Sequence, residues 1–252
     1  MASTKRTIDN VSDAGEGEDN SPAKKLKPHF AQSDIITIFV DTGVHQETFY
    51  AHRDRLCSRS RFFAGCLNHD FSEAKTREIA LGDDDTVAVA SFLTWLYTGT
   101  FDVNESVAKR IPSIYAFADK ICAEEYCNAI VDAYRTWARS EKKLMTISML
   151  LELYARGLRH KSLTRYGVDD EIWDMVSDTK EASKNATILE CHEKSLNSLK
   201  KYTSEPELAE DIMRLLLASH KTAPVSPDLR NNCEYHEHTE EGSCAARKLD
   251  KR

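Results

Sequence analysis

The stretch AHRDRLCSRSRFFAGCLNHDFSE, residues 51–73, decides the fold class, because a helical apolar pattern begins in it directly after a strand-like run. Its serines at positions 58 and 60 are residues that helix caps prefer. We therefore expect two short helices in succession, the second beginning near Ser60. The apolar positions that recur at helical spacing are Leu56, Phe62, Phe63, Cys66 and Leu67.

A predicted β-hairpin precedes this pair of helices. Residues 35–40 read IITIFV, a short, β-branched and nearly continuous apolar run that is typical of a buried strand. A turn around Gly43 follows, and residues 47–52, ETFYAH, return as a second strand. Residues 35–51 are therefore predicted to form a hairpin.

After the pair of helices, the pattern returns to a strand and then to helices. Residues 77–81, REIAL, predict a short strand, and the acidic residues 83–85 begin a helix that Gly99 ends. Residues 111–121 and 127–134 predict two further helices. A hairpin, two helices, a strand and more helices in this order indicate a compact α+β unit, with helices on one side of a small sheet.

These segments resemble the BTB (POZ) domain family. The resemblance runs from about Ala31 to Trp137 and rests on four motifs in the order and at the spacing of the family: SDIITIFV, AHRDRLCSRSRFF, FLTWLYTG and YAFADKI. It implies the BTB/POZ fold over residues 31–137 and a non-enzymatic protein-interaction module. Two positions depart from the family pattern: Arg61 stands where a proline is common, and Pro112 interrupts a helix that is usually smooth.

The resemblance also implies partners, because BTB domains associate with themselves or with a cullin scaffold of ubiquitin ligases. The cullin-binding members carry a hydrophobic residue, any residue and a glutamate just after the pair of helices. Phe71, Ser72 and Glu73 stand at that place, so Phe71 is the implied apolar anchor and Glu73 the polar one. The alternative is that Phe71 packs on its own domain while Glu73 is simply solvated.

Catalytic, metal and cofactor sites are not expected. The family pattern turns His52 toward its own domain, and Cys57 and Cys66 are interpreted as small packing residues. No glycine-rich phosphate loop, nucleophile elbow or HExxH motif is present. A group of cysteines and histidines lies near the C-terminus, but its spacing does not match that of the common zinc fingers. A chance cluster is therefore favoured over a zinc site. Its members are Cys233, His236, His238 and Cys244.

Charge and hydropathy exclude other classes of function. The net charge of −7 over 252 residues argues against general binding to nucleic-acid backbones. No apolar run is long enough for a membrane span, and the start lacks a secretory signal. We therefore expect an intracellular protein, in the nucleus, the cytoplasm or both, without direct contact to nucleic acid or membrane.

The first 30 residues are rich in charge and are predicted to be disordered. The motif PAKKLKP within them is typical of nuclear-import signals, in which lysines bind an acidic receptor surface. Lys24, Lys25 and Lys27 are the import candidates, and the alternative is a solvated run of charges.

Residues 140–220 predict a helical extension that packs on the domain or forms a small bundle beside it. Its predicted helices cover 142–158, 169–178, 185–199 and a last segment that opens with a capping box from Ser204 to Glu207. Residues 221–252 are polar and predicted to be disordered.

Two hypotheses of function follow. The first is a substrate adaptor for a cullin-RING ubiquitin ligase, which the residues Phe71 to Glu73 favour. The second is a nuclear regulator or scaffold that acts through self-association or corepressor binding, which the basic motif favours.

Overall fold

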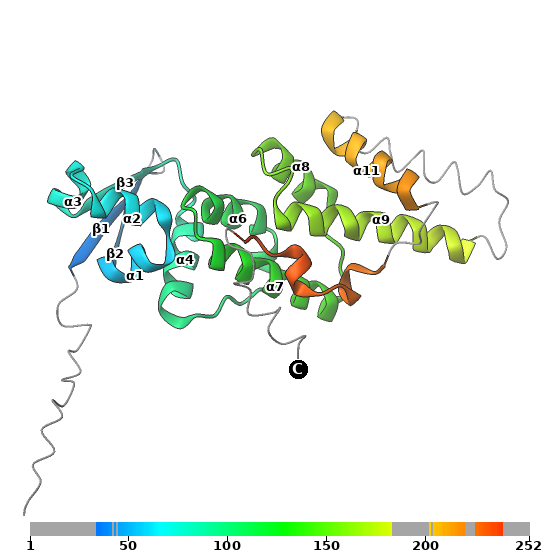
Figure 1. Ribbon diagram of the computed structural model, residues 1–252, viewed down its shortest axis with the longest axis horizontal. Helices are drawn as coiled ribbons and strands as arrows, with labels where there is room; N and C mark the ends of the chain where they lie inside the picture. The colour runs from blue at the N-terminus through cyan, green and yellow to red at the C-terminus, as the bar shows by residue number, and fades with distance from the viewer. Residues whose placement is uncertain are drawn as a thin grey trace, which may run out of the picture. The chain divides into compact units, whose positions relative to one another are not determined.

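The computed structural model describes residues 34–41, 43, 45–182, 202, 204–219 and 225–238 (Figure 1). These residues belong to one compact unit of mixed α and β structure, so the predicted α+β class is confirmed. In this described part of the chain, no helix combines the length and the apolar character that crossing a membrane requires.

A three-stranded sheet holds the N-terminal part of the unit together. Its middle strand, β1 (Ile35–Asp41), pairs antiparallel with β2 (Gln46–His52) and parallel with β3 (Glu78–Gly82). Successive side chains of β1 point to opposite faces, so Ile36, Ile38 and Val40 are all buried on the face that meets the helices. The predicted hairpin and the predicted third strand are both confirmed.

The pair of helices after the hairpin is α1 (Arg53–Arg59) and α2 (Arg61–Asn68). Ser60 separates them, and its hydroxyl oxygen accepts a hydrogen bond from the backbone N–H of Phe63 at 3.1 Å. The same hydroxyl donates to the carbonyl oxygen of Ile121 at 2.6 Å, and Ser60 is almost fully buried. The predicted start of the second helix near Ser60 is therefore confirmed, and the cap also ties α2 to the helices behind it.

Four helices complete this part: α4 (Thr86–Thr98), α5 (Glu105–Ala108), α6 (Ile111–Lys120) and α7 (Glu124–Glu141), after the short α3 (Ser72–Thr76). The carboxylate of Asp85 caps α4 by accepting from the backbone N–H of Val87 at 2.9 Å. Gly99 ends α4 with a φ of +73°, which favours glycine. Pro112 lies in the first turn of α6, where its missing N–H costs no helical hydrogen bond, so this departure from the pattern leaves α6 intact.

The extension consists of α8 (Ile147–Ala155), α9 (Ser162–Ala182) and α11 (Pro206–Ser219) among the described residues. Helix α8 packs on α6, α9 packs on α7 and α8, and α11 packs on α8 and α9 (Figure 1). Leu150, Leu153 and Leu208 are fully buried there. Of the two predicted arrangements, the structure shows an extension packed directly on the domain.

Two helices of the extension begin at other residues than those predicted. The helix predicted over 142–158 begins only at Ile147, because Lys142 adopts a left-handed conformation that ends α7 and Thr146 caps α8. The helix predicted over 169–178 begins earlier, at Ser162, through residues that include Thr164 and Gly167, which have low helix propensity. The helix predicted over 185–199 lies outside the described residues.

The prediction of a disordered tail over residues 221–252 is wrong for residues 225–238, which we call the C-terminal strap. Two short 3-10 helices, η3 (Pro227–Leu229) and η4 (Asn232–Tyr235), pack against α9, and η4 also contacts α7 (Figure 1). Tyr235 is 1% exposed. The strap has few apolar residues, but side chains of α7 satisfy its main-chain polar groups, which composition does not reveal. Residues 1–30 and the rest of the tail lie outside the described residues.

Candidate functional site

The residues Phe71, Ser72 and Glu73 lie at the start of α3, directly after the pair of helices. Phe71 is the residue before the first helical turn, with extended backbone angles, and 56% of its side chain is exposed. Its ring is therefore accessible to another protein, as are those of Tyr50 and Tyr97 elsewhere on the surface. The alternative in which Phe71 packs into its own domain does not match this exposure.

The end of α2, just before the loop that leads to Phe71, is bonded to α1. The guanidinium of Arg53 donates to the carbonyl oxygen of Leu67 at 2.7 Å and to the side-chain oxygen of Asn68 at 2.8 Å. The ring of His69 meets the ring of Phe71 edge to face, with centroids 6.0 Å apart. The end of α2 is therefore tied to α1, and the exposed ring of Phe71 lies against the ring of His69.

Glu73 carries the negative charge of the site. Its carboxylate accepts from the hydroxyl of Ser72 at 2.9 Å. Hydrogen bonds from its own backbone N–H and from Ser72 lower the pKa of Glu73 below its ordinary value. A carboxylate in the first turn of a helix also interacts favourably with the helix dipole. The site therefore presents an exposed aromatic ring with a carboxylate two residues away, which suits protein contact.

The end of α3 is fixed by Arg77. Its left-handed backbone, with a φ of +61°, lets its N–H donate to the carbonyl oxygen of Glu73 at 2.9 Å. Its guanidinium lies 3.2 Å from the carboxylate of Asp34 at the start of the sheet. The site thus lies on a short helix that is tied to β1 and leads directly into β3.

The histidine and cysteines of the same stretch serve the fold. The hydroxyl oxygen of Tyr97 accepts the backbone N–H of His52 at 2.9 Å and lies 2.7 Å from Nδ1 of its ring. Burial raises the pKa of the thiols of Cys57 and Cys66, which disfavours the nucleophilic thiolate. These residues therefore have the structural roles that the sequence predicted.

Of the four residues of the C-terminal zinc hypothesis, the structure describes Cys233, His236 and His238. Sγ of Cys233 lies 3.4 Å from Nε2 of His238, whereas Nε2 of His236 lies 3.0 Å from the carboxylate of Asp132 on α7. Cys244 lies outside the described residues. Within the part of the chain that the structure describes, no group of three or more His, Cys, Asp or Glu side chains is arranged to hold a metal ion.

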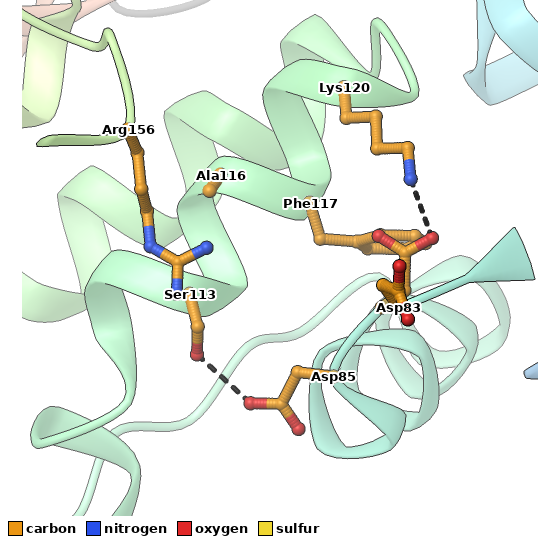
Figure 2. A pocket seen from close by; sticks show the side chains of 8 residues that line it. Asp83, Asp85, Ser113, Ala116, Phe117, Lys120 and Arg156 are labelled. Carbon is orange, nitrogen blue, oxygen red and sulfur yellow. Dashed lines mark hydrogen bonds and ion pairs between the residues drawn. The ribbon is translucent and has the colours of Figure 1, made fainter. Parts of the chain in front are cut away.

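A pocket of about 400 Å³ lies at the other end of β3, between residues 83–85, α6 and Arg156 at the end of α8 (Figure 2). Nζ of Lys120 lies 2.7 Å from the carboxylate of Asp84, and the hydroxyl of Ser113 donates to Asp85 at 3.0 Å. Arg156 pairs with Glu152 of α8 at 2.9 Å, and Asp85 also lies 3.1 Å from Arg110, so these charged groups have partners inside and outside the pocket.

The structure brings together part of what the sequence predicted for function. Phe71, Ser72 and Glu73 are adjacent on the surface, but the contacts of Arg53 with the end of α2 and of His69 with Phe71 were missed. No local pattern marks these two, since Arg53 belongs to the preceding helix. Lys24, Lys25 and Lys27 lie outside the described residues, so their predicted role in import stays a prediction.

One comparison with known proteins bears on this site. A family model described as the BTB/POZ domain matches residues 26–133 of the chain. The match includes all three strands, the pair of helices, the motif at residues 71–73 and most of α7. It begins five residues earlier and ends four residues earlier than the range 31–137 that the sequence motifs indicate.

Proposed function

Because the chain contains a BTB/POZ domain, which is a protein-protein interaction module and generally not an enzyme, we propose that it is an adaptor that binds a cullin scaffold of ubiquitin ligases through Phe71 and Glu73. The observation that carries the proposal is the 56% exposure of Phe71, two residues before Glu73 and directly after the pair of helices. An aromatic ring that becomes buried at the centre of an interface can supply most of its binding energy.

The charge of Glu73 supplies the second part of the argument. A carboxylate beside an apolar anchor fixes the register of a partner and excludes partners with acidic surfaces. An ordinary glutamate is ionised at neutral pH, and the hydrogen bonds of Glu73 lower its pKa further, so the charge is present there.

The proposal is tested by calorimetric titration of the purified full chain with a purified cullin N-terminal region. Phe71→Ala is expected to weaken binding about thirtyfold, which matches a hot spot of about 2 kcal/mol. Glu73→Gln is expected to weaken binding less, and its effect should shrink as salt is raised. Tyr50→Ala is the matched control, because Tyr50 is an aromatic residue of β2 with 66% exposure. Equal affinity of wild type and Phe71→Ala would contradict the proposal.

We also propose, on the sequence alone, that Lys24, Lys25 and Lys27 direct nuclear import, which fits a role as a nuclear regulator or scaffold. The test is the distribution of a fluorescent reporter fused to residues 1–30. Replacing the three lysines with alanine should return the reporter from the nucleus to an even distribution. An unchanged distribution would remove this second function.

A further inference from the structure

The face of α7 that meets the C-terminal strap carries a stripe of polar side chains. Asn128, Asp132, Arg135 and Arg139 follow one another at intervals of four, three and four residues, so they lie along one side of the helix. Each of them contacts the strap. Together with Tyr166 and Asp169 of α9, these residues form what we call the strap-binding face.

Most of these contacts are hydrogen bonds to the main chain of the strap. The guanidinium of Arg135 donates to the carbonyl oxygens of Pro227 at 2.8 Å and Arg230 at 3.1 Å. The guanidinium of Arg139 donates to the carbonyl oxygen of Asp228 at 2.6 Å. Contacts to the main chain do not depend on which side chains the bound segment carries.

The side-chain amide of Asn128 makes the most specific of the main-chain contacts. It donates to the carbonyl oxygen of Glu237 at 3.0 Å and accepts the N–H of the same residue at 2.7 Å. Such a paired contact imitates one step of a β-ladder and requires the bound segment to be extended at that point.

Side chains of the strap are bound as well. Charged or polar groups of Asp228, Arg230 and His236 lie 3.4, 2.8 and 3.0 Å from those of Arg139, Asp169 and Asp132, respectively. The buried ring of Tyr235 lies 4.8 Å from the guanidinium of Arg135, and its hydroxyl donates to Asp169 at 2.9 Å. The carboxylate of Glu237 accepts from the backbone N–H of Ser162 at 2.7 Å. Ser162 is the first residue of the long helix α9, where the helix dipole favours an anion.

Apart from these anchors, the strap contributes little to the apolar core. Leu229 is 80% exposed and Val225 is 53% exposed, so the larger aliphatic side chains of the strap point toward solvent. A segment that is held by main-chain hydrogen bonds, polar side-chain pairs and one buried aromatic ring has the contacts of a bound peptide.

We propose that the strap-binding face is a peptide-docking site for a partner protein, and that the C-terminal strap occupies it in cis. The partner peptide carries a tyrosine at the end of a 3-10 turn and an acidic residue two positions later, as Tyr235 and Glu237 do. Because the strap is tethered, its effective concentration is about millimolar, so it competes with the partner and sets the affinity that the partner must exceed. This site is independent of Phe71 and of any cullin.

The experiment measures binding of a fluorescent peptide with the sequence of residues 225–238, with serine in place of its cysteine, to the full chain by fluorescence anisotropy. Wild type should bind at least about tenfold more weakly than Tyr235→Ala, because the intact strap occupies the face. A peptide with alanine at the tyrosine position should not bind. Asn128→Ala combined with Tyr235→Ala should weaken binding again.

Circular dichroism of each variant separates loss of binding from loss of folding. If Tyr235→Ala keeps its helical signal and does not bind the peptide, the proposal is overturned. If that variant unfolds, a full chain with a protease site at residues 221–224 replaces it. After cleavage, the C-terminal fragment that carries the strap should dissociate on dilution, while the helices of the remaining chain stay folded. The remaining chain should then bind the fluorescent peptide. A chain that unfolds when the fragment leaves shows instead that the strap belongs to the core.

Discussion

Tyr115 and Tyr126 are both fully buried, but their hydroxyl groups differ. The hydroxyl of Tyr115 lies 2.8 Å from that of Ser162, which links α6 to the start of α9. The hydroxyl of Tyr126 has no hydrogen-bond partner among the described residues, although its ring packs 4.9 Å from that of Trp95. Leaving a buried hydroxyl unpaired costs about 1–3 kcal/mol, whereas the packing of the ring stabilises the fold.

From this difference, Tyr126→Phe should raise the free energy of unfolding by about 1 kcal/mol, because it removes an unpaired polar group and keeps the ring. Tyr115→Phe should lower it by about 1 kcal/mol, because Ser162 loses its partner. Urea unfolding followed by circular dichroism compares the two variants. Equal losses of stability in both would show that the hydroxyl of Tyr126 is satisfied.

The ionisation of Asp170 on α9 makes the stability of the folded protein depend on pH. Asp170 is 7% exposed and accepts the backbone N–H of Met145 at 3.1 Å. Burial raises its pKa to about 6, despite the opposing hydrogen bond, and the charge of Asp228 adds to the effect. Between the ordinary aspartate pKa near 3.8 and about 6, the unfolded chain loses this proton while the folded chain keeps it. The contribution of Asp170 to stability therefore decreases as pH rises through this window and is level above it.

Asp170→Asn should remove this dependence, because the asparagine oxygen can still accept from Met145 and no charge is buried. The free energy of unfolding, measured from pH 4 to pH 7 for wild type and variant, should differ in slope between pH 4 and pH 6. Between pH 4 and pH 7, the free energy of unfolding of the variant should rise relative to that of wild type. The gain is about 1.4 kcal/mol for each unit by which folding raises the pKa of Asp170. Parallel curves would contradict the argument.

At the scale of the elements, the path of the chain through the BTB/POZ domain follows from local patterns. The apolar, β-branched run of β1, the serine cap of α2 and the acidic start of α4 each appear in the sequence as well as in the structure. The start of α9 does not appear in the sequence pattern, because tertiary contacts rather than helix propensity stabilise it. Gly167 shows this directly, since a Cβ built there would lie 2.4 Å from Sδ of the buried Met145 and 2.8 Å from Leu150.

Gly167→Ala should therefore lower the melting temperature, although alanine is normally preferred to glycine in a helix by about 1 kcal/mol. Overpacking of this kind costs about 1–3 kcal/mol, because Met145 and Leu150 are buried and have little room to move. Gly65→Ala in α2 is the matched control, since a Cβ there meets nothing within 4 Å. It should raise the melting temperature. A rise for both variants would show that α9 and α8 pack less closely than described.

The candidate site illustrates the same limit of prediction from sequence. The exposed Phe71 and the charge of Glu73 were predicted by position, through the resemblance to the family. The hydrogen bonds of Arg53 to the end of α2 and the strap-binding face were not predicted. Both depend on side chains that meet only when separate elements pack. Polar residues in a tail are typical of disorder, and only the structure shows that Arg135 and Asn128 satisfy the main chain of the strap.

At the scale of the whole molecule, the BTB/POZ domain and the extension are one folded unit with two proposed contact surfaces. The surface at Phe71 belongs to the start of α3, and the strap-binding face belongs to α7 and α9. An adaptor needs two such surfaces, one for a scaffold and one for a second protein. BTB/POZ domains also associate with themselves, and such self-association would add copies of both surfaces to the same assembly.

The measurement that tests the central claim most directly is affinity purification of the tagged full chain from cells, with identification of the bound proteins. It is run beside the Phe71→Ala, Glu73→Ala double variant and the Tyr50→Ala control. We expect a cullin with wild type and with the control, and none with the double variant. A cullin retained by the double variant, or absent from wild type, would contradict the proposal that residues 71–73 bind the scaffold.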